Sequence, residues 1–175
     1  NIGCLYQNPL RGTAPNLTIE ENLALAYTRK ASPSFFALNK KDSAYFREVL
    51  STLGMGLEDR MKTKIGLLSG GQRQAASLLM ATIAEPELLL LDEHTAALDP
   101  GAAEKVMALT KKIVEENKIT TLMITHDMEY ALEYGSRTIM LDSGKIVMDL
   151  TGKEREEMTT GKLAELFYGK AHKRG

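Results

Sequence analysis

The sequence has one cysteine, almost no net charge and no long apolar run. The single cysteine, Cys4, cannot form an internal disulfide, which fits a reducing compartment. Apolar runs are short, such as the leucines at 88–91, whereas a membrane-spanning helix needs ~20 apolar residues. The net charge of −1 gives no electrostatic reason to expect a nucleic acid or a charged membrane surface as partner. These features exclude a disulfide-stapled fold and argue against a membrane span or a nucleic-acid-binding role.

The N-terminus lacks two further features, a secretory signal and an initiator methionine. No basic region precedes an apolar run there, and the chain opens on Asn1 directly before the apolar stretch at 2–6. We therefore expect the chain to be cut from something longer. The 43% hydrophobic and 26% charged residues are ordinary for a globular domain, and 175 residues suffice for one domain with a small subdomain.

A block of helical patterns lies between stretches of strand. Thr18 and Glu21 form a capping box that opens a helix expected to run to about Arg29. A second helix ends at Gly54 and a third at Pro86. Further helices are expected at 102–116, 128–133 and 162–167, strands at 2–6, 88–91 and 120–125, and a hairpin at 137–141 and 146–150.

This order of elements predicts an α/β fold with a parallel sheet and an inserted helical block. We expect residues 1–10 and 87–150 to form a partial core domain, and residues 11–86 to form the helical subdomain. Residues 151–175 are expected to add a C-terminal helix and a basic tail at 170–175. The leucine strand at 88–91 reads as a central parallel strand covered on both faces.

Two adjacent carboxylates, Asp92 and Glu93, follow that strand. A buried strand that ends in two acids is poor for stability, because side chains alternate between faces and one acid can face the interior. The pair is useful if the carboxyl end of the strand is a site, as is usual in open parallel sheets. Asp92 could then hold Mg²⁺ and Glu93 could polarise an attacking water, whereas the simpler alternative is a charged turn.

A second candidate is Leu68-Ser69-Gly70-Gly71-Gln72, at the start of the third helix. The glycines let the backbone approach a ligand closely, and the helix N-terminus offers N–H groups and a positive dipole end to an anion. Ser69 could add its hydroxyl. The alternative is an ordinary N-cap with a flexible lead-in.

The histidines have unequal claims to a functional role. His126 follows the strand at 120–125, where a ring can hydrogen-bond a phosphate or a carboxylate, although a lone histidine there is more often a cap or a surface residue. His94 directly follows the two acids and could support them. His172 lies in the basic tail.

In this order, these features together resemble the ATPase domain of ABC transporters. The resemblance spans about 2–150 and implies the ABC type of the P-loop NTPase fold, with a RecA-like core and an inserted helical signature subdomain. Gln7 is similar to the family's Q-loop glutamine, and Leu68-Ser69-Gly70-Gly71-Gln72 to its signature motif. The stretch 88–93 is similar to the Walker B strand with its catalytic glutamate. Ala97-Leu98-Asp99 is similar to the D-loop, and Thr125-His126-Asp127 to the segment with the switch histidine.

The resemblance also implies a role for each matched residue. Asp92 would bind Mg²⁺ through water, and Glu93 would be the general base for the hydrolytic water. His126 would contact the γ-phosphate of ATP, and Gln7 would touch the metal or the water. Two such domains sandwich two ATP molecules head to tail in this family. The signature residues Ser69, Gly70, Gly71 and Gln72 would therefore bind the nucleotide held by the partner chain. Asp99 would lie across the dimer interface.

The sequence departs from the family pattern at several places. No G-x-x-x-x-G-K-[ST] occurs, so the P-loop (the Walker A segment) is absent, as is the aromatic residue that normally precedes it and stacks on adenine. We therefore expect weak ATP binding and negligible hydrolysis by this piece alone, and an active ATPase with an N-terminal part present. His94 stands where the family usually has proline, and Ala75 where it often has a second arginine, but neither change removes a catalytic group.

Two other kinds of function stay open, that of a non-transport ABC ATPase and that of a non-enzymatic module. Chromosome-maintenance and DNA-repair ATPases carry the same motifs, but they place a long coiled coil between the Q-loop and the signature. Here Gln7 and Ser69 are only roughly 60 residues apart, with no sustained heptads. Translation-factor members fuse two ATPase domains and need a basic linker that this sequence lacks. A non-enzymatic interaction or regulatory module would explain the missing P-loop, but the intact Asp92, Glu93 and His126 oppose it.

The expected assembly is that of a transporter. The chain would pair with a second ATPase subunit and dock through its helical block on the cytoplasmic loops of a separate permease, with a substrate-binding protein as a further partner and no nucleic acid. It would be cytoplasmic, peripheral on the inner face of the cell membrane. The segment at 16–53, with Ser32-Pro33-Ser34-Phe35-Phe36, would help select the permease. A separate ATPase polypeptide favours import, and an amino acid or similar small solute is the cargo expected by analogy alone.

Overall fold

The computed structural model describes residues 1–28 and 40–171. Its chain forms two compact units, Asn1–Ile124 and Thr125–Gly175. The first unit contains both the expected sheet and the expected helical block, and the second contains the hairpin and the C-terminal helices. The domain boundaries that the sequence suggested stay a prediction.

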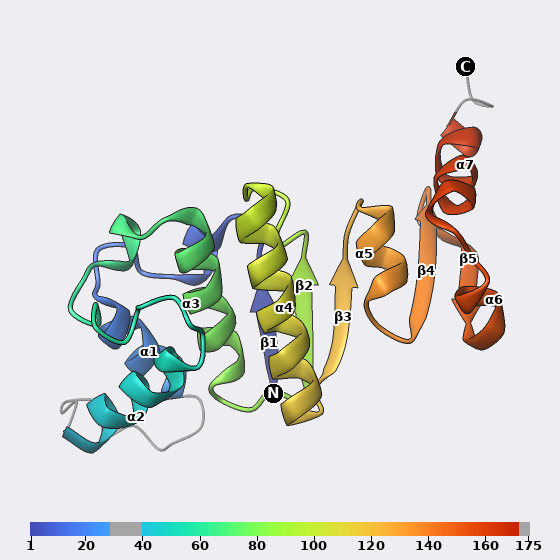
Figure 1. Cartoon of the computed structure of the whole chain (residues 1–175). Coiled ribbons are helices and arrows are strands. Elements are labelled where there is room, and N and C mark those ends of the chain that lie inside the picture. Colours follow the sequence, from blue (N-terminus) through green and yellow to red (C-terminus); the bar gives the residue numbers. More distant parts are fainter. Residues whose placement is uncertain (29–39, 172–175) are drawn as a thin grey trace. The chain divides into compact units, whose positions relative to one another are not determined.

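The strands of the first unit form a parallel sheet, and its helices lie on one side of that sheet (Figure 1). The sheet contains β1 (Ile2–Leu5), β2 (Leu88–Asp92) and β3 (Thr120–Ile124) in the order β1-β2-β3. Leu5 pairs with Leu91 and Leu91 with Met123, so the strands are in register along their length. Parallel neighbours require a crossover connection, and α4 (Pro100–Asn117) supplies the one between β2 and β3. The predicted parallel α/β architecture is confirmed.

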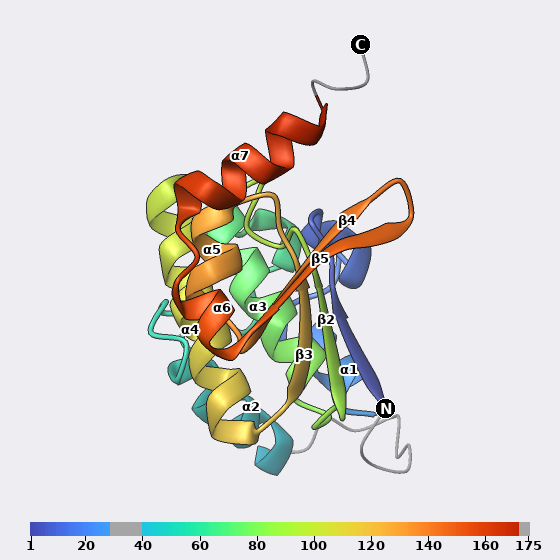
Figure 2. The same ribbon diagram turned by 90° about the vertical axis from the view of Figure 1, so that its right-hand side faces the viewer.

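The two faces of this sheet differ. Because side chains alternate along a strand, Leu5, Leu89 and Leu91 point to one face, where they are buried under α3 (Gly70–Thr82) and α4 (Figure 2). On the opposite face Leu122 and Ile124 are 54% and 55% exposed. Among the described residues of this unit, helices thus cover one face of the sheet and leave the other partly exposed, whereas the run of leucines in β2 led us to expect cover on both faces.

The helical block contains short 3-10 turns at η1 (Pro9–Gly12) and η2 (Ile65–Leu67) and the helices α1 (Ile19–Tyr27) and α2 (Lys40–Ser51). The capping box of α1 is present: the amide of Glu21 donates to Oγ1 of Thr18 at 3.2 Å, and the amide of Thr18 donates to Oε2 of Glu21 at 2.7 Å. Gly54, which follows α2, has φ +62°, a conformation that favours glycine. Arg29 and the Ser32-Pro33-Ser34-Phe35-Phe36 segment lie outside the described residues.

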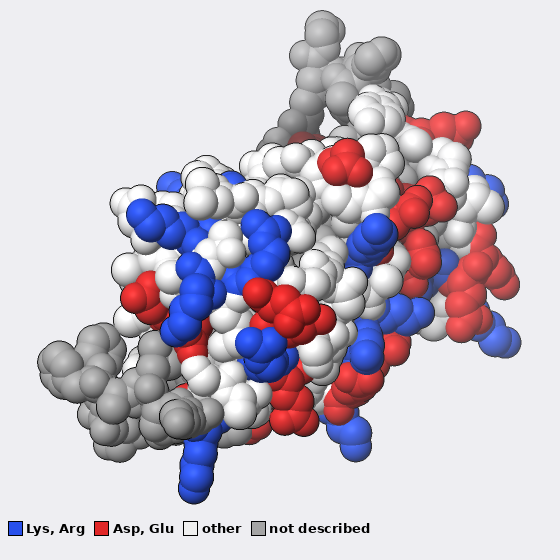
Figure 3. Space-filling view, turned by 60° about the vertical axis from the view of Figure 1, so that its left-hand side comes forward, with Lys and Arg blue, Asp and Glu red and all other residues white. Residues whose placement is uncertain are grey.

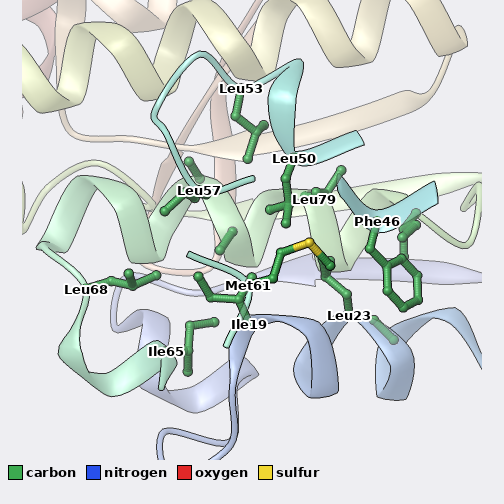
Figure 4. Close-up of a cluster of buried hydrophobic side chains, with 14 residues drawn as sticks. Ile19, Leu23, Phe46, Leu50, Leu53, Leu57, Met61, Ile65, Leu68 and Leu79 are labelled. Carbon is green, nitrogen blue, oxygen red and sulfur yellow. The ribbon is translucent and has the colours of Figure 1, made fainter. Parts of the chain in front are cut away.

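An apolar cluster holds the helical block together and joins it to α3 (Figure 4). Ile19 and Leu23 of α1, Phe46 and Leu50 of α2, and Leu57 in the following loop are all buried. A buried carboxylate, Glu20, adds polar contacts to this core, since it accepts hydrogen bonds from Ser43 of α2 and from Lys62. The block is therefore a packed subdomain rather than a loop.

The second unit contains α5 (Met128–Glu133), an antiparallel hairpin of β4 (Arg137–Asp142) and β5 (Lys145–Thr151), α6 (Gly152–Glu156) and α7 (Thr160–Ala171). The hairpin and α7 are confirmed predictions. The short elements α6, η1 and η2 were not predicted. Arg155 of α6 joins this unit together, because its guanidinium donates to the carbonyls of Leu132 and Tyr134 at 2.6 and 2.8 Å. Residues 172–175 of the expected basic tail lie outside the described part.

Charged side chains of both signs are mixed on the surface. On the face shown in Figure 3, Lys and Arg side chains are interspersed with Asp and Glu, as the net charge of −1 suggests. Over the ranges 1–28 and 40–171, no helix is long and apolar enough to cross a membrane.

Candidate functional site

The carboxyl end of the parallel sheet brings together the residues expected to do chemistry in the first unit. Leu5 is the last residue of β1 and pairs with Leu91, and Asp92 is the last residue of β2, so Gln7 and Asp92 lie at the same end of the sheet. Gln7 and Asp92 are both exposed, and Glu93 is half-buried. Open parallel sheets bind ligands at this end. The structure therefore places these three predicted site residues where the fold allows a site.

Glu93 has an unusual backbone conformation. Its φ is +44°, in the left-handed region that non-glycine residues seldom adopt. Its amide donates to the carbonyl of Ile124 in β3 at 3.0 Å, and its own carbonyl accepts from the amide of Ala96 at 3.0 Å. Such a conformation costs on the order of 1–3 kcal/mol and persists where the surroundings fix it, which is common at functional sites. The hydrogen bonds of its amide and of its carbonyl thus fix the backbone of Glu93 directly after β2.

His94 is part of the interior, although it follows two acids at the end of a strand. The side chain is 2% exposed, and its Nε2 lies 3.3 Å from Oγ1 of Thr110 in α4. Burial lowers the pKa of His94 from 6.5 to about 4, because the charged ring would lose its hydration. From the sequence we expected His94 to support the two acids, but no pattern indicated that its side chain is buried or that it contacts Thr110.

The signature segment forms the N-terminus of α3. Ser69 is the N-cap, and its Oγ accepts from the amide of Gln72 at 3.3 Å while Oε1 of Gln72 accepts from the amide of Ser69 at 3.4 Å. Gln72 also donates to the carbonyl of Met55 at 3.3 Å and accepts from Arg60 at 3.3 Å. Both side chains therefore have structural roles within the chain, as the N-cap alternative requires.

The glycines of this segment permit close packing inside the chain. A Cβ added at Gly71 would lie 3.0 Å from Cβ of Ala102, and one at Gly70 would lie 3.2 Å from Cδ2 of Leu98. Asp99, in the same loop, is the N-cap of α4 and accepts from the amide of Ala102 at 3.0 Å. The structure thus brings the predicted signature and D-loop segments of one chain together, and part of the need for glycine here comes from that contact.

Gln74 is a buried polar residue that the sequence reading missed. Its side chain is fully buried, and Nε2 donates to the carbonyl of Tyr6, the residue before Gln7, at 3.2 Å. Its Oε1 has no hydrogen-bond partner in the described part of the chain. The signal was its spacing, because Gln74 shares the inward face of α3 with Gly71 and Leu78. It links the helix that begins at the signature to the segment containing Gln7.

His126 lies in the second unit, just after β3. The adjacent Asp127 caps α5, accepting from the amides of Glu129 and Tyr130 at 2.9 and 3.1 Å, and its own amide donates to Oγ1 of Thr125 at 3.0 Å. These bonds fix the backbone around His126. His172 is outside the described residues.

The side chains at the carboxyl end of the sheet suit Mg²⁺ better than a metal bound by nitrogen and sulfur. Among the residues that the structure describes, no three His, Cys, Asp or Glu side chains gather into a closed metal site. Mg²⁺ binds oxygen ligands, keeps several waters and often uses only one or two carboxylates together with substrate phosphates. The exposed carboxylate of Asp92, at the same end of the sheet as Gln7, fits that pattern better than the tetrahedral geometry of nitrogen and sulfur ligands that zinc prefers.

Comparison with known proteins decides the family. The family model described as "ABC transporter" matches residues 1–96, a stretch that includes Gln7, the signature segment and the two acids at the carboxyl end of β2. The chain belongs to the ABC transporter family. The resemblance seen in the sequence, to an ABC nucleotide-binding domain, is therefore confirmed. The residue roles carried over from the motifs are not tested by this match.

Relatives in the ABC transporter family include ATP-binding proteins named for tyrosine transport and for phosphonate import. The chain is 42% identical over 166 residues to a tyrosine transport ATP-binding protein of Clostridioides difficile, covering 95% of this chain and 66% of that protein. It is 35% identical over 152 residues to the phosphonates import ATP-binding protein PhnC 2 of Oceanobacillus iheyensis, covering 85% of this chain and 58% of the relative. The chain thus spans less than two thirds of the length of these relatives.

Solved ABC structures share the fold. A metal-chelate type ABC transporter in an inward-facing conformation matches with a TM-score of 0.74 and 25% identity, over 95% of this chain and 63% of the other. A dimeric ATP-binding cassette in a post-hydrolysis state, bound to ADP and Pi, matches with a TM-score of 0.71 and 30% identity, over 86% of this chain and 62% of the other. These likenesses confirm the ABC-type P-loop NTPase fold class.

Proposed function

We propose that this chain is part of the ATP-binding and ATP-hydrolysing subunit of an ABC transporter that powers import. The observation that carries the proposal is the carboxyl end of β2, where Asp92 is exposed and Glu93 is fixed in a left-handed conformation. A strand end built in this way costs stability, so it needs a function to explain it. The names of the relatives support a transport function, and that of the phosphonates import protein supports import as the direction.

The proposed roles of the acids follow from their different surroundings. The exposed Asp92 is suited to bind Mg²⁺ through water, together with Gln7 from the segment after the neighbouring strand β1. Bound Mg²⁺ would neutralise charge on the phosphates of ATP. Glu93 is suited to accept a proton from the attacking water as general base, because its backbone is held by Ile124 and Ala96. His126 is proposed to contact the γ-phosphate.

The signature segment is proposed to act on the nucleotide held by a partner chain. The N-terminus of α3 offers backbone N–H groups and a positive dipole end to a phosphate. Ser69 and the two glycines lie at this N-terminus, Gln72 fixes it through the capping box, and Asp99 lies in the adjoining loop. A second ATPase subunit, placed head to tail, would complete the site. The dimeric ATP-binding cassette similar to this chain supports the pairing of two such subunits.

The remaining partners and the location are proposed from the same family. The helical subdomain would dock on a permease, a substrate-binding protein would deliver a small solute, and the subunit would be cytoplasmic at the inner face of the membrane. A second candidate function is a catalytically incompetent interaction module or a non-transport ABC ATPase. Of these two, only the interaction module is favoured by an observation, the lack of a G-x-x-x-x-G-K-[ST] motif within these 175 residues, because a non-transport ATPase would also need that motif.

A Mg-ATP titration tests the proposal. Binding and hydrolysis are measured on this chain and on the whole gene product, meaning the chain with whatever flanking segments its gene encodes. We expect weak binding and negligible turnover by the chain, and binding with turnover by the whole gene product. If neither protein binds Mg-ATP, the catalytic function is wrong and the interaction module takes its place.

A further inference from the structure

Glu93 and His94 are neighbours whose side chains lie in opposite surroundings. Glu93 is half-buried at the carboxyl end of β2, in a left-handed backbone conformation with φ +44°. His94 is 2% exposed. The bond from the amide of Ala96 to the carbonyl of Glu93 closes a turn here, and the ring of His94 is the first buried side chain in it.

The hydrogen bond of His94 has a definite direction. The hydroxyl of Thr110 donates its only proton to the carbonyl of Val106, 2.8 Å away within α4. Oγ1 of Thr110 lies 3.3 Å from Nε2 of His94 and can take part in this second bond only as the acceptor. The neutral ring therefore carries its proton on Nε2 and donates it to Thr110.

Three contacts surround the left-handed residue. Its amide donates to Ile124 in β3, its carbonyl accepts from Ala96, and the side chain of the next residue bonds to α4. A strained conformation persists only where its surroundings fix it in this way. The first two contacts are backbone bonds that most side chains would permit, whereas the third depends on the histidine and on Thr110.

We propose that His94 is a positioning residue for Glu93. The bond from its ring to Thr110 holds the turn after β2, and this turn keeps Glu93 in the left-handed conformation that sets the place of its carboxylate. The effect on the backbone is independent of any activity. Its consequence for catalysis rests on the proposed function, in which Glu93 is the general base.

The first test measures the backbone of this chain by NMR. The one-bond coupling between Cα and Hα and the intraresidue NOE of Glu93 report whether φ is positive. Thr110→Val keeps the shape of the side chain but removes the acceptor, and His94→Leu removes the donor. His94→Gln places an amide nitrogen at a similar reach and should restore the bond. We expect Thr110→Val and His94→Leu to lose the positive-φ signature of Glu93 and His94→Gln to retain it.

Thr82→Val is the matched control. Thr82 is also buried and helical and donates to the carbonyl of Leu78 at 2.9 Å, but it lies in α3 and has no bond to His94. Its loss should destabilise the fold to a similar degree while leaving the Glu93 signature intact. The proposal is overturned if Thr110→Val leaves the signature unchanged, or if Thr82→Val removes it as well.

The second test measures turnover in the whole gene product. We expect Thr110→Val and His94→Leu to lower kcat by about tenfold or more, with a KM for ATP within about twofold of the starting protein, because positioning affects the chemical step rather than binding. His94→Gln and Thr82→Val should stay near the starting kcat. Equal losses in Thr110→Val and Thr82→Val would contradict the proposal. If the unaltered protein shows no turnover, the proposed function fails, while the NMR test still decides the role of His94.

Discussion

At the scale of single residues, the buried imidazole of His94 makes the stability of the first unit depend on pH. The pKa of its ring is lowered to about 4 in the fold by burial, against 6.5 in the unfolded chain. Above pH 6.5 the ring is neutral in both states, and the contribution of its burial is fully present. As the pH falls from 6.5 towards 4, the unfolded chain binds a proton that the folded chain does not, so stability is lost.

We predict that the chain, without metal or nucleotide, loses about 2 kcal/mol more unfolding free energy between pH 7 and pH 5 than His94→Gln does. Urea unfolding at each pH measures the difference between the two proteins, which removes the contribution of other titrating groups. An equal loss in both proteins would mean that the ring is not held neutral in the fold.

Glu93 gives the second prediction at this scale. In the whole gene product, Glu93→Gln keeps the size and the backbone of the residue but cannot accept a proton at neutral pH. We expect Mg-ATP binding to be preserved and turnover to fall by about a hundredfold or more, since a positioned general base contributes about 10²–10⁴ in rate. ATP should accumulate in a closed dimer, which light scattering would detect. If Glu93→Gln hydrolyses ATP at nearly the rate of the unaltered protein, Glu93 is not the general base.

At the scale of elements, Gln74 links α3 to the segment after β1. Gln74→Leu removes the bond to the carbonyl of Tyr6 but also removes the unpartnered Oε1, so we expect a stability change of no more than about 1 kcal/mol. The segment at Tyr6 and Gln7 should become more mobile. Backbone order parameters from NMR relaxation measure this directly.

Ser77→Ala is a suitable control for Gln74→Leu. Ser77 is buried in the same helix, but its hydroxyl donates to the carbonyl of Arg73 at 2.9 Å and does not reach β1. Order parameters at Tyr6 and Gln7 should therefore stay unchanged in Ser77→Ala. The same values in Gln74→Leu as in the unaltered chain would show that the Gln74 bond does not restrain this segment.

The elements themselves were largely predictable from the sequence. Capping residues such as Thr18 with Glu21, and the switch from helical spacing to the leucine run before Asp92, depend only on neighbours along the chain, and the helices and strands lie close to where these signals put them. The contacts at the site were not predictable in the same way. His94 with Thr110, and Gln74 with Tyr6, join residues far apart in the sequence, and no local pattern announces such a bond.

The coverage of the sheet is a further difference between sequence and structure. A run of leucines in β2 was read as burial on both faces, but apolar character only permits burial and does not supply a covering layer. Among the described residues of the first unit, no helix covers the part of the second face where Leu122 and Ile124 are more than half exposed. The sequence predicted which residues are apolar, and only the fold could show which of them the described chain covers.

At the scale of the whole molecule, the proposed site depends on a second copy or partner subunit, because Ser69 and its neighbours would act on the partner's nucleotide. Ser69→Arg removes the N-cap of α3, at about 1 kcal/mol, and places a long cation at the positive end of the helix. Ser69→Ala removes the same cap without adding bulk or charge, and so isolates the effect of the cation.

We predict that Ser69→Arg in the whole gene product still binds Mg-ATP but does not form the ATP-dependent dimer, whereas Ser69→Ala binds and dimerises. Both properties are measured in a Glu93→Gln background, so that turnover does not dissolve the dimer: nucleotide binding by calorimetry and association by analytical ultracentrifugation. Loss of nucleotide binding in Ser69→Arg but not in Ser69→Ala would place the signature segment at the nucleotide of its own chain. Retained dimerisation in Ser69→Arg would remove the segment from the dimer interface, because a buried arginine without a partner there should prevent closure.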